Sequence, residues 1–166
     1  MARFCIVQEC AVHNDIGPYI YLLAKDAHVE IESIYRGDDA RKLLNKYGKH
    51  SQYQLYHATP SQRQAWGVLG TPDMPGRSTH ELRSDGRAFP GPIGRKLAWW
   101  QQGFDVNGSA QADKLIATAR KHGWTLFRPY PSGAELHHLC FRSEPHLTKL
   151  RTKLRVYRLR HTLPRS

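Results

Sequence analysis

The sequence predicts a single α+β domain. Its 166 residues match the usual size of one domain, and 40% of them are apolar, which is enough for a sizeable core. Helical and strand patterns follow in the order helix, strand, helix, loops, helix, strand, strand, which is typical of the α+β class. We expect residues 1–144 to form the domain, and residues 145–166 to be its basic C-terminal tail or terminal helix.

The first half of the chain carries two helix patterns and one strand pattern. Residues 17–28 open with Pro18 and continue with an apolar run, as a helix does. Residues 28–35 alternate apolar and polar side chains, the period of a half-buried strand. A turn at residues 37–39 precedes a second helix that ends before Gly48. Frequent Gly and Pro between residues 60 and 94 predict loops and short strands.

The clearest helix lies at residues 107–122. Ser109 suits its N-cap, Leu115 and Ala119 lie on one apolar stripe, and Gly123 suits its end. Residues 124–128 and 135–141 predict two further strands, joined by a turn rich in Pro and Gly.

The net charge of +11 is concentrated in the last 22 residues, which hold seven Lys or Arg and no acid. Such a segment attracts polyanions, either nucleic acid or an anionic cell wall, and charge alone does not choose between them. No run reaches the roughly 20 apolar residues of a membrane span. Residues 1–7 are too short an apolar start for a secretory signal, so we expect no classical signal peptide.

Cysteine usage argues against a disulfide framework or a thiolate zinc site. The chain has three cysteines and no Cys-x-x-Cys pair, but it has ten histidines. Any metal ion would therefore be held by histidine and carboxylate side chains.

Two regions gather the side chains that a hydrolytic metal site needs. The first is Ser78–Gly86, followed later by Gly103–Asp105, and the second is Glu135–His138. Together they offer imidazoles and carboxylates for three metal ligands, plus a spare glutamate to accept a proton from water.

These regions resemble motifs of the VanY-type D-Ala-D-Ala carboxypeptidases and related phage endolysins, Ser-x-His-x-x-Gly-x-Ala-x-Asp and Glu-x-x-His. Ser78–His80 fits the start of the first motif, Gly103–Asp105 fits its end, and Glu135–His138 fits the second. Upstream, Ser33–Arg36 is similar to the family's Ser-Gly-Tyr-Arg, and Gln52 or Gln54 would match the helix that follows. The matches keep the family's order and span residues 29–141.

The resemblance implies a zinc site at a small antiparallel sheet flanked by helices, the hedgehog and D-Ala-D-Ala peptidase fold. It implies that Zn²⁺ is bound by His80, Asp105 and His138, with Glu135 as the catalytic base. His137 would hydrogen-bond the oxyanion or the substrate.

The resemblance also implies three residues that bind substrate, namely Arg36, Gln52 and Ser78. Arg36 offers a bidentate partner for a peptide carboxylate. Its alternative role is an ordinary surface ion pair with Asp38 or Asp39.

Two of the three predicted metal ligands have an alternative residue nearby in the sequence. The family motif places its histidine and aspartate seven residues apart, but Asp105 lies 25 residues after His80. Asp85 is nearer, and we prefer Asp105 because its flanking residues are typical of a buried strand end. On a regular strand, residues three apart face opposite sides, so His137 rivals His138 unless Glu135 lies in a turn or the strand bulges.

We therefore expect a zinc-dependent peptidoglycan hydrolase that cuts a stem-peptide or crossbridge bond, as a D,D- or L,D-carboxypeptidase or endopeptidase. A phage endolysin of this kind is made in the host cytoplasm, released by a holin or by lysis, and acts on the wall as a monomer. Its basic tail would bind anionic wall polymers, with no specific nucleic acid partner. The alternatives are a basic, histidine-rich metal nuclease and a non-catalytic wall-binding module.

Overall fold

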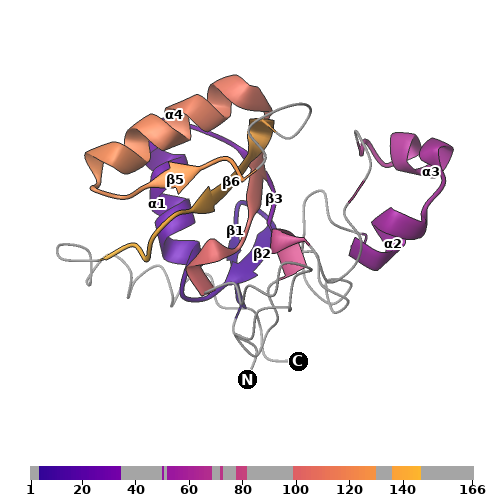
Figure 1. Cartoon of the computed structure of the whole chain (residues 1–166), viewed down its shortest axis with the longest axis horizontal. Helices are drawn as coiled ribbons and strands as arrows, with labels where there is room; N and C mark the ends of the chain where they lie inside the picture. Colours follow the sequence, from indigo (N-terminus) through magenta and orange to yellow (C-terminus); the bar gives the residue numbers. More distant parts are fainter. Residues whose placement is uncertain are drawn as a thin grey trace.

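The computed structural model describes residues 4–34, 50, 52–68, 72, 78–81, 99–129 and 136–146. These ranges form helices and small antiparallel sheets, so the predicted α+β class is confirmed (Figure 1). One sheet pairs β1 (Phe4–Val7) with β2 (Cys10–His13). The other has the order β3-β4-β6-β5, with every neighbouring pair antiparallel. Its strands are Ile31–Ser33, Phe104–Val106, His138–Phe141 and Leu126–Phe127.

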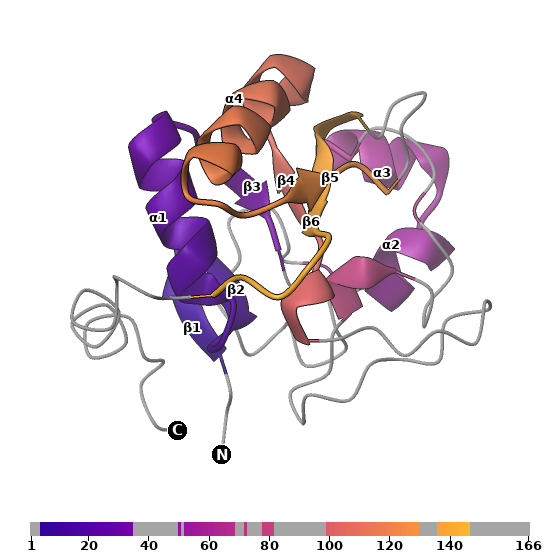
Figure 2. The ribbon, with the colours of Figure 1, turned by 60° about the vertical axis from the view of Figure 1, so that its left-hand side comes forward.

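Two helices pack on one side of the sheets. The predicted helix at residues 17–28 is α1 (Gly17–Ala27), and the one at 107–122 is α4 (Gly108–Lys121). They lie side by side in both orientations of the ribbon and contact each other (Figure 2). Ser109 is not the N-cap, because α4 begins at Gly108 and Asn107 is its N-cap, two residues before Ser109. Gly123 follows α4 with a φ of 76°, which fits the predicted stop.

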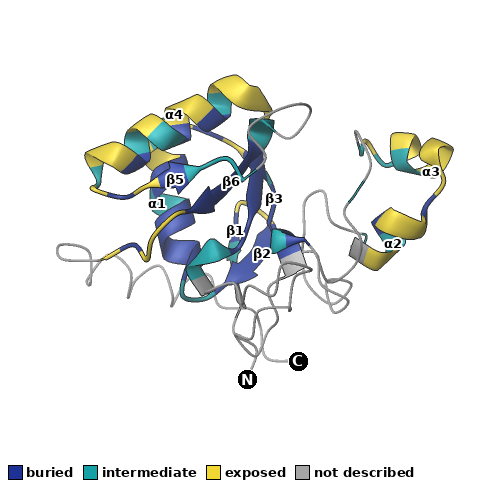
Figure 3. Ribbon diagram, viewed as in Figure 1, coloured by how far each residue is buried: buried dark blue, intermediate teal, exposed yellow. Residues whose placement is uncertain are grey.

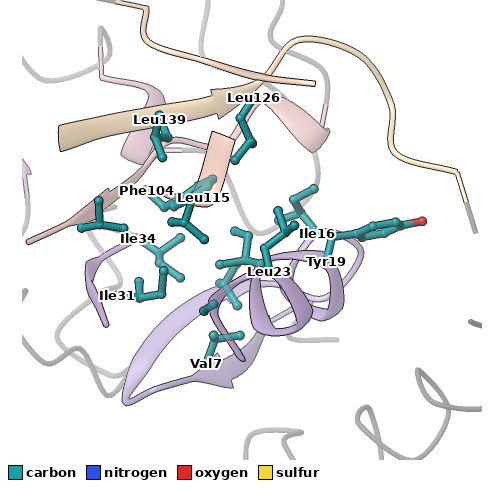
Figure 4. Close-up of a cluster of buried hydrophobic side chains, with 14 of the residues drawn as sticks. Val7, Ile16, Tyr19, Leu23, Ile31, Ile34, Phe104, Leu115, Leu126 and Leu139 are labelled. Atoms are coloured by element: carbon teal, nitrogen blue, oxygen red, sulfur yellow. The ribbon is translucent and has the colours of Figure 1, made fainter. Parts of the chain in front are cut away.

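The core lies between these helices and one face of the four-stranded sheet (Figure 4). Leu23 of α1 and Leu115 of α4 are fully buried there. From the sheet come the buried side chains Ile31, Phe104, Val106, Leu139 and Phe141. Since side chains alternate along a strand, the residues between them face the opposite side of the sheet. Those residues are where the candidate site forms.

The β1–β2 hairpin was not predicted. Its two-residue turn consists of Gln8 and Glu9, both with positive φ angles, whereas such turns usually carry Asn or Gly. The Gln8 side chain helps to hold the turn, because its Nε2 donates to Val29 O (3.1 Å) and its Oε1 accepts from Ile31 N (2.7 Å). The hairpin is therefore fixed by tertiary hydrogen bonds, which the local sequence does not predict.

The expectation of loops and short strands from residue 60 onward is wrong at its start. Helix α3 (Pro60–Ala65) follows α2 (Gln52–His57). Thr59 and Gln62 form a reciprocal capping box, and Pro60 occupies the first helical turn, where it needs no N–H partner. Both helices are largely exposed, in contrast to the buried strands (Figure 3).

The remaining expectations fall partly outside the described residues. The predicted strands at 28–35, 124–128 and 135–141 appear as the shorter β3, β5 and β6. The helix predicted before Gly48, the segment 82–98 and the tail from residue 147 lie outside the described ranges. Pro145 is buried, and Trp124 Nε1 donates to His146 O (3.2 Å), so residues 145–146 lie against the domain. In the described part of the chain, no helix is long and apolar enough to cross a membrane.

Candidate metal centre

The second face of the four-stranded sheet presents polar side chains in register. Asp105 of β4 pairs with Ser33 of β3 on one side and with His138 of β6 on the other. Asp105 and His138 are both buried, at 4% and 2% exposure. Strand pairing alone therefore brings together two residues that lie far apart in the sequence.

His80 reaches this face from a short 3-10 turn, Thr79–Glu81. The His80 Nδ1 donates to Ile34 O at 2.5 Å, just beyond the end of β3. Gly103 N, directly before β4, donates to Thr79 O (3.0 Å). Ser78 Oγ accepts from His80 N (3.2 Å), so its hydroxyl shapes the turn. These bonds dock the turn against two strands.

Gly103 allows this close approach because it has no side chain. A Cβ at this position would lie 2.2 Å from Thr79 Oγ1 and 2.4 Å from His138 Cε1. Neither atom belongs to the free end of a flexible exposed chain, so any larger residue would displace the turn or the ring. The glycine before Asp105 therefore has a steric role in the cluster.

The three polar side chains converge on one point. His138 Nδ1 lies 2.7 Å from Asp105 Oδ1, and His80 Nε2 lies 3.3 Å from the same oxygen. One ligand atom from each of the three residues falls within 4.8 Å of the others. The two imidazole rings are 4.6 Å apart at their centroids and inclined by 61°. The described residues thus contain a buried group that could hold a metal ion.

The donor set passes a chemical test for a bound ion. Zinc bonds of about 2.0–2.2 Å in a tetrahedron place neighbouring ligand atoms roughly 3.3 Å apart. His80 Nε2 lies 3.3 Å from Asp105 Oδ1, and His138 Nδ1 lies 2.7 Å from it. The ring nitrogens that face away from the cluster form hydrogen bonds of their own. His80 Nδ1 bonds to Ile34 O, and His138 Nε2 bonds to Thr79 Oγ1. Such outer hydrogen bonds orient metal-binding histidines.

Without a metal, His138 carries a proton. Burial lowers its pKa, but the hydrogen bond to Asp105, the hydrogen bond to Cys140 and the negative charge of Asp105 outweigh that effect and raise the pKa to about 10. The resulting imidazolium balances the buried Asp105 carboxylate. A metal ion would replace that proton as the positive charge beside Asp105.

Glu32 is a neighbour of the site that the sequence did not reveal. The register between β3 and β4 shifts between Ile31 and Ser33, so Glu32 sits in a bulge opposite Asp105. Burial raises the pKa of Glu32, the charge of His137 lowers it, and the charge of Asp105 raises it. The carboxyl therefore lies within the electrostatic reach of the cluster. In the sequence, Glu32 is only a polar position in an alternating strand pattern, and this does not indicate a role in the site.

His138, and not His137, joins the cluster. Leu136 and His137 form a 3-10 turn directly before β6, so the strand is not regular at this point. Arg128 supports the turn by donating from Nε to Leu136 O (2.6 Å), while its Nη2 pairs with Asp113 of α4 (2.8 Å). The half-buried His137 is thereby left beside the site.

The other predicted residues divide into two groups. Ser78 is buried next to His80, and Gln52 lies at the start of α2, where only its backbone is described. Arg36, Asp85 and Glu135 lie outside the described residues, so their predicted roles stay predictions.

Comparison with protein-family models, with curated proteins and with solved structures finds no match to this chain.

Proposed function

We propose that this protein is a zinc-dependent peptidoglycan peptidase of the D-Ala-D-Ala carboxypeptidase type, acting as a phage endolysin. The observation that carries the proposal is the convergence of His80, Asp105 and His138 into one buried group. These are the residues that the resemblance to the VanY-type enzymes designates as ligands, in the same chain order. An antiparallel sheet with the cluster on one face also fits the fold of that family, which is shared with the hedgehog proteins.

Zinc is the metal that this donor set favours. Two imidazoles and one carboxylate supply three protein ligands, the number that catalytic zinc sites use while one position stays open for water or substrate. Softer thiolate sites need cysteine ligands, and purely oxygen sites suit magnesium or calcium. A Zn²⁺ ion bound here would supply Lewis-acid polarisation of a carbonyl and would lower the pKa of water.

The chain's own residues would do the remaining work. Glu135 accepts the proton of the attacking water and passes it to the departing amine. His137, half-buried beside the cluster, donates to the carbonyl oxygen as negative charge develops there. Arg36 binds a carboxylate of the stem peptide, and Gln52 and Ser78 flank the substrate.

The positive charge of the C-terminal segment fits a substrate in the bacterial cell wall. The seven basic residues between 145 and 166 attract anionic wall polymers through long-range electrostatics. Release to the wall would come from a holin or from lysis, as expected for an endolysin made in the host cytoplasm.

The test combines metal content with product analysis. Purified protein should contain stoichiometric zinc by elemental analysis and should release peptide fragments, identified by mass, from defined peptidoglycan. Glu135→Ala should keep the zinc and lose the release of fragments. Full hydrolysis by Glu135→Ala would contradict the proposed mechanism.

A parallel incubation with plasmid DNA separates the peptidase from a metal nuclease, which the net charge of +11 and the adjacent His137 and His138 would suit. If the protein cleaves plasmid DNA and leaves cell walls intact, the peptidase proposal is wrong and the nuclease is favoured. Elemental analysis addresses the non-catalytic wall-binding module, because stoichiometric zinc is hard to explain in a domain that only binds the wall.

A further inference from the structure

We propose that Thr79 is a positioning residue that holds His138 in the state in which the ring can bind a metal. The inference rests on the metal site of the proposed function, and it is independent of which bond that site cuts. Thr79 is adjacent to one ligand, His80, and its hydroxyl contacts the other histidine, His138. One turn would therefore supply a ligand and orient a second.

The geometry gives each nitrogen of His138 its own partner. Nδ1 lies 2.7 Å from Asp105 Oδ1, on the side of the cluster, and Nε2 lies 2.8 Å from Thr79 Oγ1 on the opposite side. A metal at Nδ1 needs the lone pair of that nitrogen, so the ring keeps its proton on Nε2. Thr79 Oγ1 is in place to accept this proton in a hydrogen bond.

Burial makes this partner important. His138 is 2% exposed, so bulk water does not replace a lost acceptor at Nε2. A second described contact of Nε2 is the thiol of Cys140, at 3.8 Å, and sulfur accepts hydrogen bonds weakly. Among the described contacts of Nε2, the threonine hydroxyl is thus the strong one.

The position of Thr79 is itself fixed by its backbone. Gly103 N donates to Thr79 O (3.0 Å), and the missing side chain of Gly103 leaves the space in which the hydroxyl and the His138 ring meet. Since Gly103 also precedes Asp105 by two residues, all three ligands are tied to the same small set of contacts. A threonine held this firmly orients the ring with little loss of conformational freedom on metal binding.

The test compares three variants in the full chain. Thr79→Val keeps the shape and removes the acceptor, Thr79→Ser keeps the hydroxyl, and Thr125→Val is a matched control at an exposed threonine away from the cluster. Zinc affinity is measured by competition with a chromophoric chelator at one pH. Thr79→Val should bind zinc roughly 10–100-fold more weakly, while Thr79→Ser and Thr125→Val stay near the wild-type value.

A second readout follows the proton itself. In ¹H–¹⁵N NMR spectra of the zinc-loaded wild-type protein, the His138 ring should carry its proton on Nε2. This proton should exchange slowly with water. Exchange should be faster in Thr79→Val and little changed in Cys140→Ala. The ring nitrogen that carries the proton does not depend on overall stability, and the wild-type spectrum decides the matter if Thr79→Val does not fold.

Three results would overturn the inference: wild-type zinc affinity in folded Thr79→Val, equal losses in Thr79→Ser and Thr79→Val, or a wild-type ring protonated on Nδ1 in the zinc-loaded protein. Neither readout uses peptidoglycan. A protein that binds zinc as described but leaves walls intact would defeat the proposed function and leave the role of Thr79 standing.

Discussion

The two faces of the four-stranded sheet are built from the same short strands and are stabilised by different forces. On one face, Phe104, Leu139 and Phe141 are fully buried against the helices, where stability follows the apolar area removed from water. On the other, Asp105 and His138 are equally buried, yet each depends on specific hydrogen-bond partners. Burial alone therefore does not define a core: the first face should lose stability according to the apolar volume that is removed, whereas the second should be damaged by a change of chemistry at constant size.

The largest expected effect comes from changing the chemistry of the polar face. Asp105→Asn keeps the size of the side chain but removes the charge that faces both histidines at 2.7 and 3.3 Å. Stoichiometric zinc should be lost, and hydrolysis should fall on the order of 10³-fold, because the ion's stabilisation of several kcal/mol disappears. Elemental analysis and fragment release measure the two losses. An Asp105→Asn protein that retains zinc would mean that another carboxylate, such as Asp85, is the ligand.

A large truncation on the apolar face should lower stability without removing the ligands. Phe141 is fully buried and packs near Phe104, Trp124 and Tyr19. Phe141→Ala should reduce the free energy of unfolding by about 3–5 kcal/mol, the usual cost of such a cavity. Chemical denaturation measures the change, and zinc content at saturating metal should stay stoichiometric. A selective loss of zinc with unchanged stability would contradict the separation of the two faces.

The polar face should also be the pH-sensitive one. In the metal-free protein the pKa of His138 is raised from 6.5 to about 10. Its contribution to stability is therefore fully present below about pH 6.5 and is lost as the pH rises through 10. Denaturation in the presence of a chelator should show a fall of a few kcal/mol across this window.

Two further measurements test whether His138 is the source of this pH dependence. Asp105→Asn should show a smaller fall, because the partner that raises the pKa is gone. Zinc should show the opposite trend and bind more tightly as the pH rises, since the ion displaces a proton. An equal fall in Asp105→Asn and in the wild type would show that His138 is not its source.

The smallest effect is expected from a conservative swap on the apolar face. Leu139 lies between His138 and Cys140 in β6 and points to the core. Leu139→Met should cost less than about 1.5 kcal/mol and leave zinc affinity unchanged, because the volume is nearly conserved. Calorimetric unfolding and the chelator competition assay measure the two quantities. A tenfold loss of zinc affinity here would show that the faces are coupled through the strand.

The elements that the sequence predicted best are those with local signals. The α4 helix was found because Leu115 and Ala119 share an apolar stripe and Gly123 ends it. The β1–β2 hairpin was missed because Gln8 and Glu9 are not usual turn residues and are held by contacts with Val29 and Ile31. Contacts between distant segments leave no mark in a single sequence.

The candidate site shows the same division. His80, Asp105 and His138 were named from a motif resemblance, since nothing local indicates that a turn and two strands meet. Thr79 and Glu32 escaped notice because their importance depends on a hydrogen bond across 59 residues and on a strand bulge. Both are tertiary features.

None of the three cysteines, all of which lie in the described part of the chain, forms a disulfide, so no covalent cross-link joins the described segments. An ion held jointly by His80 and His138 would act as such a link in the folded protein, and its binding free energy would add to the stability of the fold, because the unfolded chain does not assemble the site. Removing the metal would then destabilise this protein as reduction of its disulfides destabilises a secreted protein. Chelators in a purification buffer would lower its melting temperature as well as its activity.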